Sequence, residues 1–142
     1  MSDLLDASVW VPLVATDHEH HGRARKYWYD EADPSIAFCR VTALAFLRHL
    51  TNPHIMQHAV VTNVTAWSVY EEWLRLPEIC FLDEPATTHA QLGELSRSLP
   101  ISSSLWTDAY LAAFALAGNH RIVTFDRDFQ KFPGLQLLYL QG

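Results

Sequence analysis

The sequence is poor in cysteine, in glycine and in long hydrophobic runs, and each shortage excludes a class of protein. Two cysteines and five glycines among 142 residues are too few for a disulfide-stapled scaffold or a collagen-like chain. No apolar run approaches the ~18 residues of a membrane helix, and the first residues, MSDLLDAS, lack the features of a signal peptide. Cys39 and Cys80 stand apart without zinc-type spacing. We therefore expect buried free thiols, with a disulfide as the alternative, in a cytoplasmic protein.

Basic residues are also scarce. Ten Lys and Arg stand against 16 Asp and Glu, which gives a net charge of −6, so any contact with nucleic acid must be local or carried by metal ions. Hydrophobic residues make up 49% of the chain, enough for a core in a domain of this length. We expect a single domain over residues 1–140. The last residues, LYLQG, resemble the remnant of a protease site, so Gln141 and Gly142 are left outside that domain.

Short apolar segments alternate with helical patterns along the chain. The strand candidates are Leu4–Ala7, Ile36–Cys39, Ile79–Leu82 and Arg121–Phe125. The helix candidates are His18–Asp30, a helix capped by Thr42 that ends at Asn52-Pro53, Val64–Leu74, a helix opened by Asp83-Glu84-Pro85, and Leu105–Ala117 after the capping cluster Ser102–Ser104. This alternation predicts an α/β fold with a central, mainly parallel sheet flanked by helices. In such sheets the carboxyl ends of the strands form the ligand crevice.

The segment Leu105–Ala117 is apolar nearly all round, and Asp108 is its only charge. Its neighbours on the helix face are the small residues Ala112 and Ala115, so the carboxylate points toward the protein. An unpaired carboxylate there costs several kcal/mol unless a cation or hydrogen-bond donors compensate it. The alternative is an anion near a helix N-terminus, which the helix dipole favours by ~0.3–1 kcal/mol.

Asp6 and Asp126 each lie at the carboxyl end of a strand candidate. Taken alone, Asp6 also fits an N-cap of a helix that begins near Val9, and Asp126 fits an ordinary turn or cap. Together with Asp108 they can converge in one cleft, where mutual repulsion would trap a divalent cation. Oxygen ligands without Cys or His favour Mg²⁺ or Mn²⁺ over Zn²⁺. The chemistry that fits is metal-assisted hydrolysis of phosphodiesters, with an activated water as nucleophile.

Three motifs make the pattern specific: LLDASVW near the start, VTALAFLRHLTNP in the middle and TDAYLAAFALAGNHRIVTFDRDF near the end. Their order and spacing resemble the PIN-domain ribonucleases of the VapC type, the toxins of bacterial VapBC toxin–antitoxin pairs. The resemblance extends over essentially the whole chain. It implies a PIN-like fold and a Mg²⁺- or Mn²⁺-dependent endoribonuclease that cuts transfer or ribosomal RNA. It also implies a cognate VapB-type antitoxin and a homodimer.

The same resemblance assigns roles to residues. Asp6, Asp108 and Asp126 fall on the catalytic, metal-binding aspartates of the family. Ser8 and Thr124 match small polar positions that support this cluster through hydrogen bonds. Asp128 is implied as a further ligand or a supporting group.

One position departs from the family pattern. Thr42 is followed three residues later by Ala45, where the family commonly has a glutamate. Alanine supplies no oxygen, so weaker metal binding is expected. Three explanations stay open: one metal suffices, Asp128 compensates, or Ala45 was introduced to silence a toxic protein. The alternative function is therefore a catalytically silent PIN module that binds antitoxin or RNA.

Two other features favour ordinary interpretations. The cluster His18, His20 and His21 does not present one helix face, so we interpret it as a solvated helix start rather than a metal site. The aromatic stripe Trp67–Trp73, at helical spacing, favours a core or partner-facing surface over a platform for stacking bases.

Overall fold

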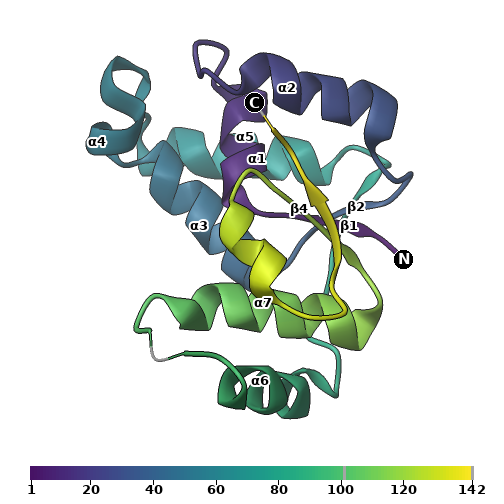
Figure 1. Cartoon of the computed structure of the whole chain (residues 1–142). Coiled ribbons are helices and arrows are strands. Elements are labelled where there is room, and N and C mark those ends of the chain that lie inside the picture. The colour runs from purple at the N-terminus through teal and green to yellow at the C-terminus, as the bar shows by residue number, and fades with distance from the viewer. Residues whose placement is uncertain (101, 142) are drawn as a thin grey trace.

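The computed structural model describes residues 1–100 and 102–141, so Gly142, set aside above, lies outside the described residues. Over those residues the chain forms a five-stranded sheet with helices packed around it (Figure 1). The strands are β1 (Asp3–Leu5), β2 (Ile36–Phe38), β3 (Ile79–Phe81), β4 (Arg121–Thr124) and β5 (Gln136–Tyr139). The helices are α1 (Ala7–Val14), α2 (His21–Lys26), α3 (Arg40–Leu50), α4 (Pro53–Met56), α5 (Asn63–Leu74), α6 (Thr88–Arg97) and α7 (Leu105–Gly118). A π-helical turn (Tyr27–Glu31) extends α2, and 3₁₀ turns follow α4 (Gln57–Ala59) and β4 (Arg127–Lys131).

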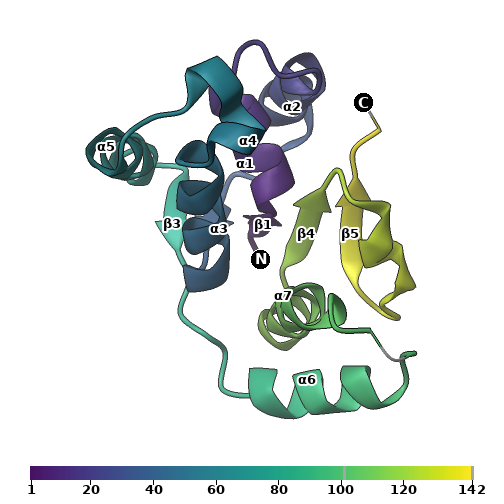
Figure 2. The ribbon, with the colours of Figure 1, turned by 90° about the vertical axis from the view of Figure 1, so that its left-hand side faces the viewer.

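The strand order is β3-β2-β1-β4-β5, and every neighbouring pair is parallel. From β1 the chain moves outward to β2 and β3, and then returns to the other side of β1 as β4 (Figure 2). The direction of winding therefore reverses between β1 and β4, which pair with Leu5 opposite Val123. In open α/β sheets this reversal opens a crevice at the carboxyl ends of the two strands. The predicted α/β fold with a parallel sheet is confirmed.

The side chains of alternate strand residues pack into two hydrophobic cores, one on each face of the sheet. Leu5 and Val123 pack into the core under α1, α3 and α5, while Leu4 and Ile122 pack into the core under α6 and α7. Figure 2 shows α6 and α7 on the side of the sheet opposite α2 and α5. In the first core the ring of Trp10 stacks on Phe38, with centroids 3.9 Å apart and planes within 6°. Burial on both faces explains why the strands read as continuous apolar runs rather than alternating ones.

Helix α7 is the best-predicted element. Seven of its residues are buried, as its apolar sequence predicts, and it ends where Asn119 takes the left-handed conformation (φ 57°) that terminates helices. The following strand, β4, stands where the predicted strand Arg121–Phe125 stands, one residue shorter.

Several predicted boundaries are wrong because local hydrogen bonds, and not apolar periodicity, fix the ends. Strand β1 ends at Leu5, and Asp6 caps a helix that begins at Ala7, two residues before Val9. Thr42 does not occupy the N-cap of α3: Cys39 does, and the Thr42 hydroxyl accepts a hydrogen bond from the Cys39 N–H at 2.9 Å. Ser104 stands at the N-cap of α7 without a side-chain capping bond.

Other elements begin later than predicted or were missed. Helix α2 starts at His21 rather than His18, and α6 starts at Thr88 rather than at Asp83-Glu84-Pro85. The short helix α4 and strand β5 were not predicted.

Both cysteines are free, Cys39 buried and Cys80 half-buried. Within the described part of the chain, no helix is long and apolar enough to cross a membrane.

Candidate active site

Two of the three predicted aspartates stand at the crevice between β1 and β4. Asp6 directly follows β1, and Asp126 lies two residues after β4. Because these strands are parallel neighbours in register, their carboxyl ends meet at the same edge of the sheet.

The third aspartate reaches this edge through the length of α7. Asp108 lies ten residues before Gly118, the end of the helix, which spans about 15 Å at about 1.5 Å per residue. The chain then turns into β4 and advances five residues from Arg121 to Asp126, about 16 Å at about 3.3 Å per residue. The helix therefore carries Asp108 back to the level of Asp126.

The electrostatics of Asp108 reflect this convergence. Its side chain is half-buried, and its pKa is raised to about 6 by burial first and then by the negative charges of Asp6 and Asp126. Lys131 opposes this shift and Asp128 adds to it. Among the described residues, none of the three carboxylates forms an ion pair with a Lys or Arg side chain. The acidic groups thus repel one another without a protein cation bound to them.

Asp6 is held in one orientation by three neighbouring groups. Its Oδ1 accepts a hydrogen bond from the Ala7 N–H at 2.9 Å, as befits the N-cap of α1. Its Oδ2 accepts bonds from the Ser8 hydroxyl at 2.8 Å and the Thr124 hydroxyl at 3.0 Å, and these two hydroxyls lie 3.2 Å apart. Asp6 is therefore both the N-cap of α1 and a member of the acidic cluster, which comprises Asp6, Asp108 and Asp126.

The same two hydroxyls organise the segment that carries Asp126. The Ser8 hydroxyl accepts from the Phe125 N–H at 3.0 Å, and the Thr124 hydroxyl accepts from the Asp126 N–H at 2.9 Å. The Asp126 carboxylate caps the following 3₁₀ turn by accepting from the Asp128 N–H at 2.9 Å. Asp128 lies within this turn and is exposed. Ser8 and Thr124 thus link the ends of β1 and β4.

The carboxylates offer the hard oxygen donors that Mg²⁺ and Mn²⁺ prefer. In the parts of the chain that the structure describes, no set of three His, Cys, Asp or Glu side chains is arranged closely enough to hold a metal ion as it stands. The oxygen donors and the negative charge of the three aspartates fit a divalent cation. Their side chains would have to move closer together to coordinate it.

Ala45 lies half-buried in the middle of α3, a helix that packs against α1. His49, one helical turn further on, was not singled out in the sequence. Burial lowers the pKa of the His49 imidazole, the charge of Asp6 partly opposes this shift, and Arg48 adds to it. His49 lines the same hollow as Ser8 and Asp126, which places it near the acidic cluster. The i, i+4 spacing from Ala45 is the sequence signal that could have identified His49.

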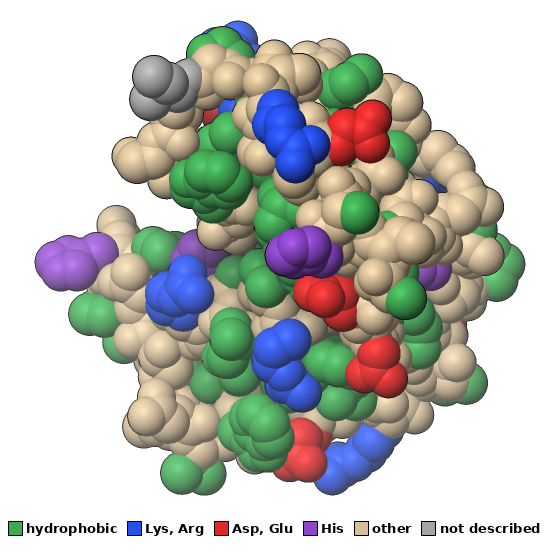
Figure 3. All heavy atoms as spheres, turned by 90° about the horizontal axis from the view of Figure 1, so that it is seen from below, with side chains coloured by type: hydrophobic (Ala, Val, Ile, Leu, Met, Phe, Trp, Pro, Cys, Tyr) green, Lys and Arg blue, Asp and Glu red, His purple; other side chains and the backbone are tan. Residues whose placement is uncertain are grey.

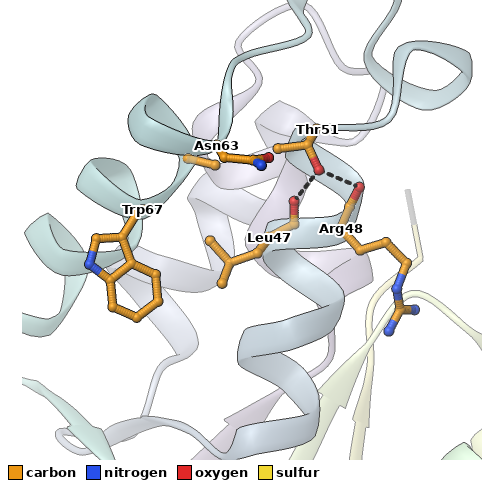
Figure 4. A pocket seen from close by; sticks show the side chains of 6 residues that line it. Leu47, Arg48, Thr51, Asn63 and Trp67 are labelled. Carbon is orange, nitrogen blue, oxygen red and sulfur yellow. Dashed lines mark hydrogen bonds between the residues drawn. The ribbon is translucent and has the colours of Figure 1, made fainter.

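A hollow of about 210 Å³ lies between α3 and α5, away from the three aspartates. It is lined by Leu47, Arg48, Thr51, Asn63, Ala66 and Trp67. Figure 4 shows Trp67 on one side and the Arg48 side chain extending away on the other. Its lining includes no carboxylate, so it is separate from the acidic cluster. Trp67 is 48% exposed, whereas Tyr70 is buried, so the core interpretation of the aromatic stripe is confirmed for Tyr70.

Charges are interspersed on the face that Figure 3 shows. Acidic and basic side chains alternate there with hydrophobic ones, and a deep notch opens on one side. This face carries no broad basic surface for a polyanion. A nucleic acid could be contacted on this face only locally, as the net charge predicts.

Comparison with known proteins identifies the class of this fold. Residues 4–135 match the PIN domain. The chain is 36% identical to Ribonuclease VapC41 of Mycobacterium tuberculosis, over 96% of this chain and 97% of that protein. It is 30% identical to Ribonuclease VapC37 of the same species, over 94% and 93% of the two chains.

Solved structures agree in fold. The chain superposes with a TM-score of 0.70 and 15% identity on a chain of VapBC-1 from nontypeable Haemophilus influenzae, covering 98% of each. It superposes with a TM-score of 0.65 and 19% identity on Mycobacterium tuberculosis VapC20, described as a sarcin-ricin loop cleaving toxin, covering 95% and 99%. The chain belongs to the PIN-domain family, among the VapC-type ribonuclease toxins of toxin–antitoxin systems.

Proposed function

We propose that the chain is an endoribonuclease that hydrolyses RNA phosphodiester bonds with Mg²⁺ or Mn²⁺ held by Asp6, Asp108 and Asp126. The observation that carries this proposal is the raised pKa of Asp108, caused by burial and by the charges of Asp6 and Asp126. Three acids from distant segments repel one another at a strand-end crevice, which is an arrangement that a divalent cation stabilises.

The residues of the chain have separate tasks in this reaction. Ser8 and Thr124 hold Asp6 in a fixed orientation through hydrogen bonds to Oδ2. The turn after β4 holds Asp126 through the Asp128 N–H. Asp6, Asp108 and Asp126 would hold the divalent cation, which would supply an activated water and offset the charge that develops on the phosphate. The carboxylates alone would repel that phosphate.

The test is cleavage of single-stranded RNA and growth arrest on expression, for the parent chain and for Asp6→Asn and Asp108→Asn. Both variants are expected to lose cleavage and growth arrest while keeping the parent's circular dichroism spectrum, and EDTA should abolish cleavage by the parent. Asp30→Asn, at an exposed acid in the π-helical turn, is the matched control and should stay active. Retained activity in both site variants would defeat the proposal.

The alternative function, a silent PIN module that binds antitoxin or RNA, is favoured by Ala45. Its test is a titration of Mn²⁺ into the chain and into an Ala45→Glu variant. If the chain is an enzyme, both bind Mn²⁺ and both cleave RNA. Binding and cleavage by the Glu variant alone would show that Ala45 has silenced the site.

The partner that we propose is a VapB-type antitoxin, with a homodimer as the assembly. Support comes from the VapBC complexes among the structural neighbours, from Haemophilus influenzae and Salmonella typhimurium. Further support comes from apolar side chains exposed on α3 and α5, namely Leu44, Val64 and Trp67. Such surface is typical of interaction sites. Co-expression of its cognate VapB-type antitoxin should relieve growth arrest, and the antitoxin should co-purify with the chain.

A further inference from the structure

A cavity of about 450 Å³ adjoins the acidic cluster. Ser8 and Asp126 form its wall toward the proposed catalytic residues, and His18, His20 and His49 form other parts of its lining. Its volume lies within the range of about 300–1,000 Å³ of small-molecule sites. Any group bound there lies directly beside Asp126, one of the three proposed catalytic carboxylates.

The segment before α2 brings imidazole rings to this cavity in a fixed arrangement. The ring of His20 stacks on Phe125, with centroids 4.3 Å apart and planes within 13°. The backbone N–H of His20 donates to Nδ1 of His18 at 3.0 Å, and the two rings lie 5.4 Å apart. Phe125 is in turn tied through its N–H to Ser8. The aromatic wall is therefore coupled directly to the residues that orient Asp6.

His49 completes the lining from another element. It comes from α3, one turn beyond Ala45, and the negative charge of Asp6 acts to raise the pKa of its imidazole. Burial lowers the pKa of His18 and of His49. Neutral imidazoles both donate and accept hydrogen bonds, which is what the edges of nucleobases require.

The composition of the lining favours a base over a phosphate. Carboxylates of Glu19 and Asp126 reach the cavity, and no Lys or Arg is among its lining residues in the described chain. A phosphate placed there would meet negative charge without a cation. The rest of the lining is apolar or aromatic, with Val11, Pro12 and Ile55 beside the rings.

We propose that this cavity binds the base of one unpaired ribonucleotide next to the scissile phosphate, with His20 and Phe125 forming an aromatic wall and His49 hydrogen bonding the base edge. The proposal rests on the proposed endoribonuclease function, since it names the part of the RNA that the same site recognises. Proteins that read RNA sequence target unpaired bases in this way, by stacking and by hydrogen bonds to exposed edges. His49 is thereby a specificity-determining residue.

The first test measures binding without catalysis. The imidazole proton resonances of the full chain are followed by NMR in EDTA, at one pH, on addition of each of the four ribonucleoside 5′-monophosphates or of ribose 5-phosphate. Resonances of His20 and His49 should shift with at least one nucleotide and much less with ribose 5-phosphate, while exposed His54 on α4 stays unchanged. Equal shifts with ribose 5-phosphate, or none at His20 and His49, would overturn the proposal.

The second test measures base preference during cleavage in Mn²⁺. RNA oligonucleotides differ only in the base next to the cut site, and kcat and KM are measured for the chain, for His49→Ala and for the control His54→Ala. The hydrogen bond from His49 to the base edge predicts a preference of about tenfold, which His49→Ala should lose mainly through KM. A preference unchanged in His49→Ala would overturn the role of His49.

The two tests separate this proposal from the one on which it rests. RNA cleavage without nucleotide-dependent shifts would reject the base cavity and leave the endoribonuclease intact. Nucleotide-dependent shifts in a chain that cleaves no RNA would support the cavity and reject the catalytic function.

Discussion

The half-buried carboxyl of Asp108 sets how the stability of the metal-free chain depends on pH. Its pKa rises from 3.8 to about 6 on folding, so the folded state binds the proton more tightly than the unfolded state. This contribution to stability is present at acid pH and is lost as the pH rises through about 6. Ionised Asp108 is therefore a destabilising group near neutral pH.

Asp108→Asn should stabilise the metal-free chain near about pH 8 by about 1 kcal/mol, a figure reduced for the solvent screening of a half-exposed group. The gain should vanish toward about pH 4 and grow through the window between pH 4 and 6. Urea unfolding in EDTA across this range measures it. A difference that does not vary with pH, or that matches the difference for Asp30→Asn, would contradict the electrostatic account.

Ser8 tests whether the orientation of Asp6 matters. Ser8→Ala removes the hydrogen bond to Asp6 Oδ2 and the bond from the Phe125 N–H. Loss of a group that orients a metal ligand lowers metal affinity or activity by about 10–100-fold. We expect that loss in Mn²⁺ affinity and in RNA cleavage, with the fold retained.

The matched control is Ser68→Ala on α5, whose hydroxyl donates to the Val64 carbonyl at 3.1 Å, in an exposed position. It should change neither Mn²⁺ affinity nor cleavage. Equal behaviour of the two variants would show that the hydrogen bonds of Ser8 do not tune the site.

At their amino ends, opposite the site, the central strands β1 and β4 are joined by a buried ion pair that the sequence did not reveal. Asp3, fully buried, accepts bonds from Arg121 Nε and Nη2, both at 2.8 Å, and from the Tyr27 hydroxyl at 2.6 Å. Burial and the hydrogen bond to Asp3 raise the pKa of Tyr27, so the hydroxyl stays protonated. The register of Asp3 opposite Arg121 fixes the two strands whose other ends carry the site.

Arg121→Met leaves the Asp3 carboxylate buried without its cation and should lower the free energy of unfolding by about 3–5 kcal/mol. The same substitution at exposed Arg75, the C-cap residue of α5, should change it by less than about 0.5 kcal/mol. Urea denaturation compares them. Similar values for the two variants would show that the pair contributes little to stability.

The elements that the sequence predicted well are those in which composition alone decides the outcome. Helix α7 is apolar on all sides and followed by Asn119, so its burial and its end both follow from local chemistry. Strand β5 was missed because its residues, 136–139, are only partly buried, and only pairing with β4 makes them a strand. Residues 18–20 were assigned to a helix, but the histidine contacts and the stacking on Phe125 hold them in turns.

For the molecule as a whole, the order of three motifs predicted the family and the fold. Asp6 and Asp126 follow the parallel neighbours β1 and β4, and α7 carries Asp108 back toward the same ends of these strands. The ligand roles of Asp6, Asp108 and Asp126 stay a prediction. The cavity lined by His49 was beyond sequence reasoning, since it depends on how α3 packs against α1 and on where the segment before α2 settles. Tertiary packing, and not periodicity, decides both.

The central claim is that Asp6, Asp108 and Asp126 hold a divalent cation at the carboxyl ends of β1 and β4. Crystals soaked in Mn²⁺ and measured at the manganese absorption edge test this claim most directly. We predict an anomalous difference peak among the three carboxylates that disappears in Asp108→Asn. Carboxylates without a peak between them, in crystals that bind Mn²⁺ elsewhere, would contradict it.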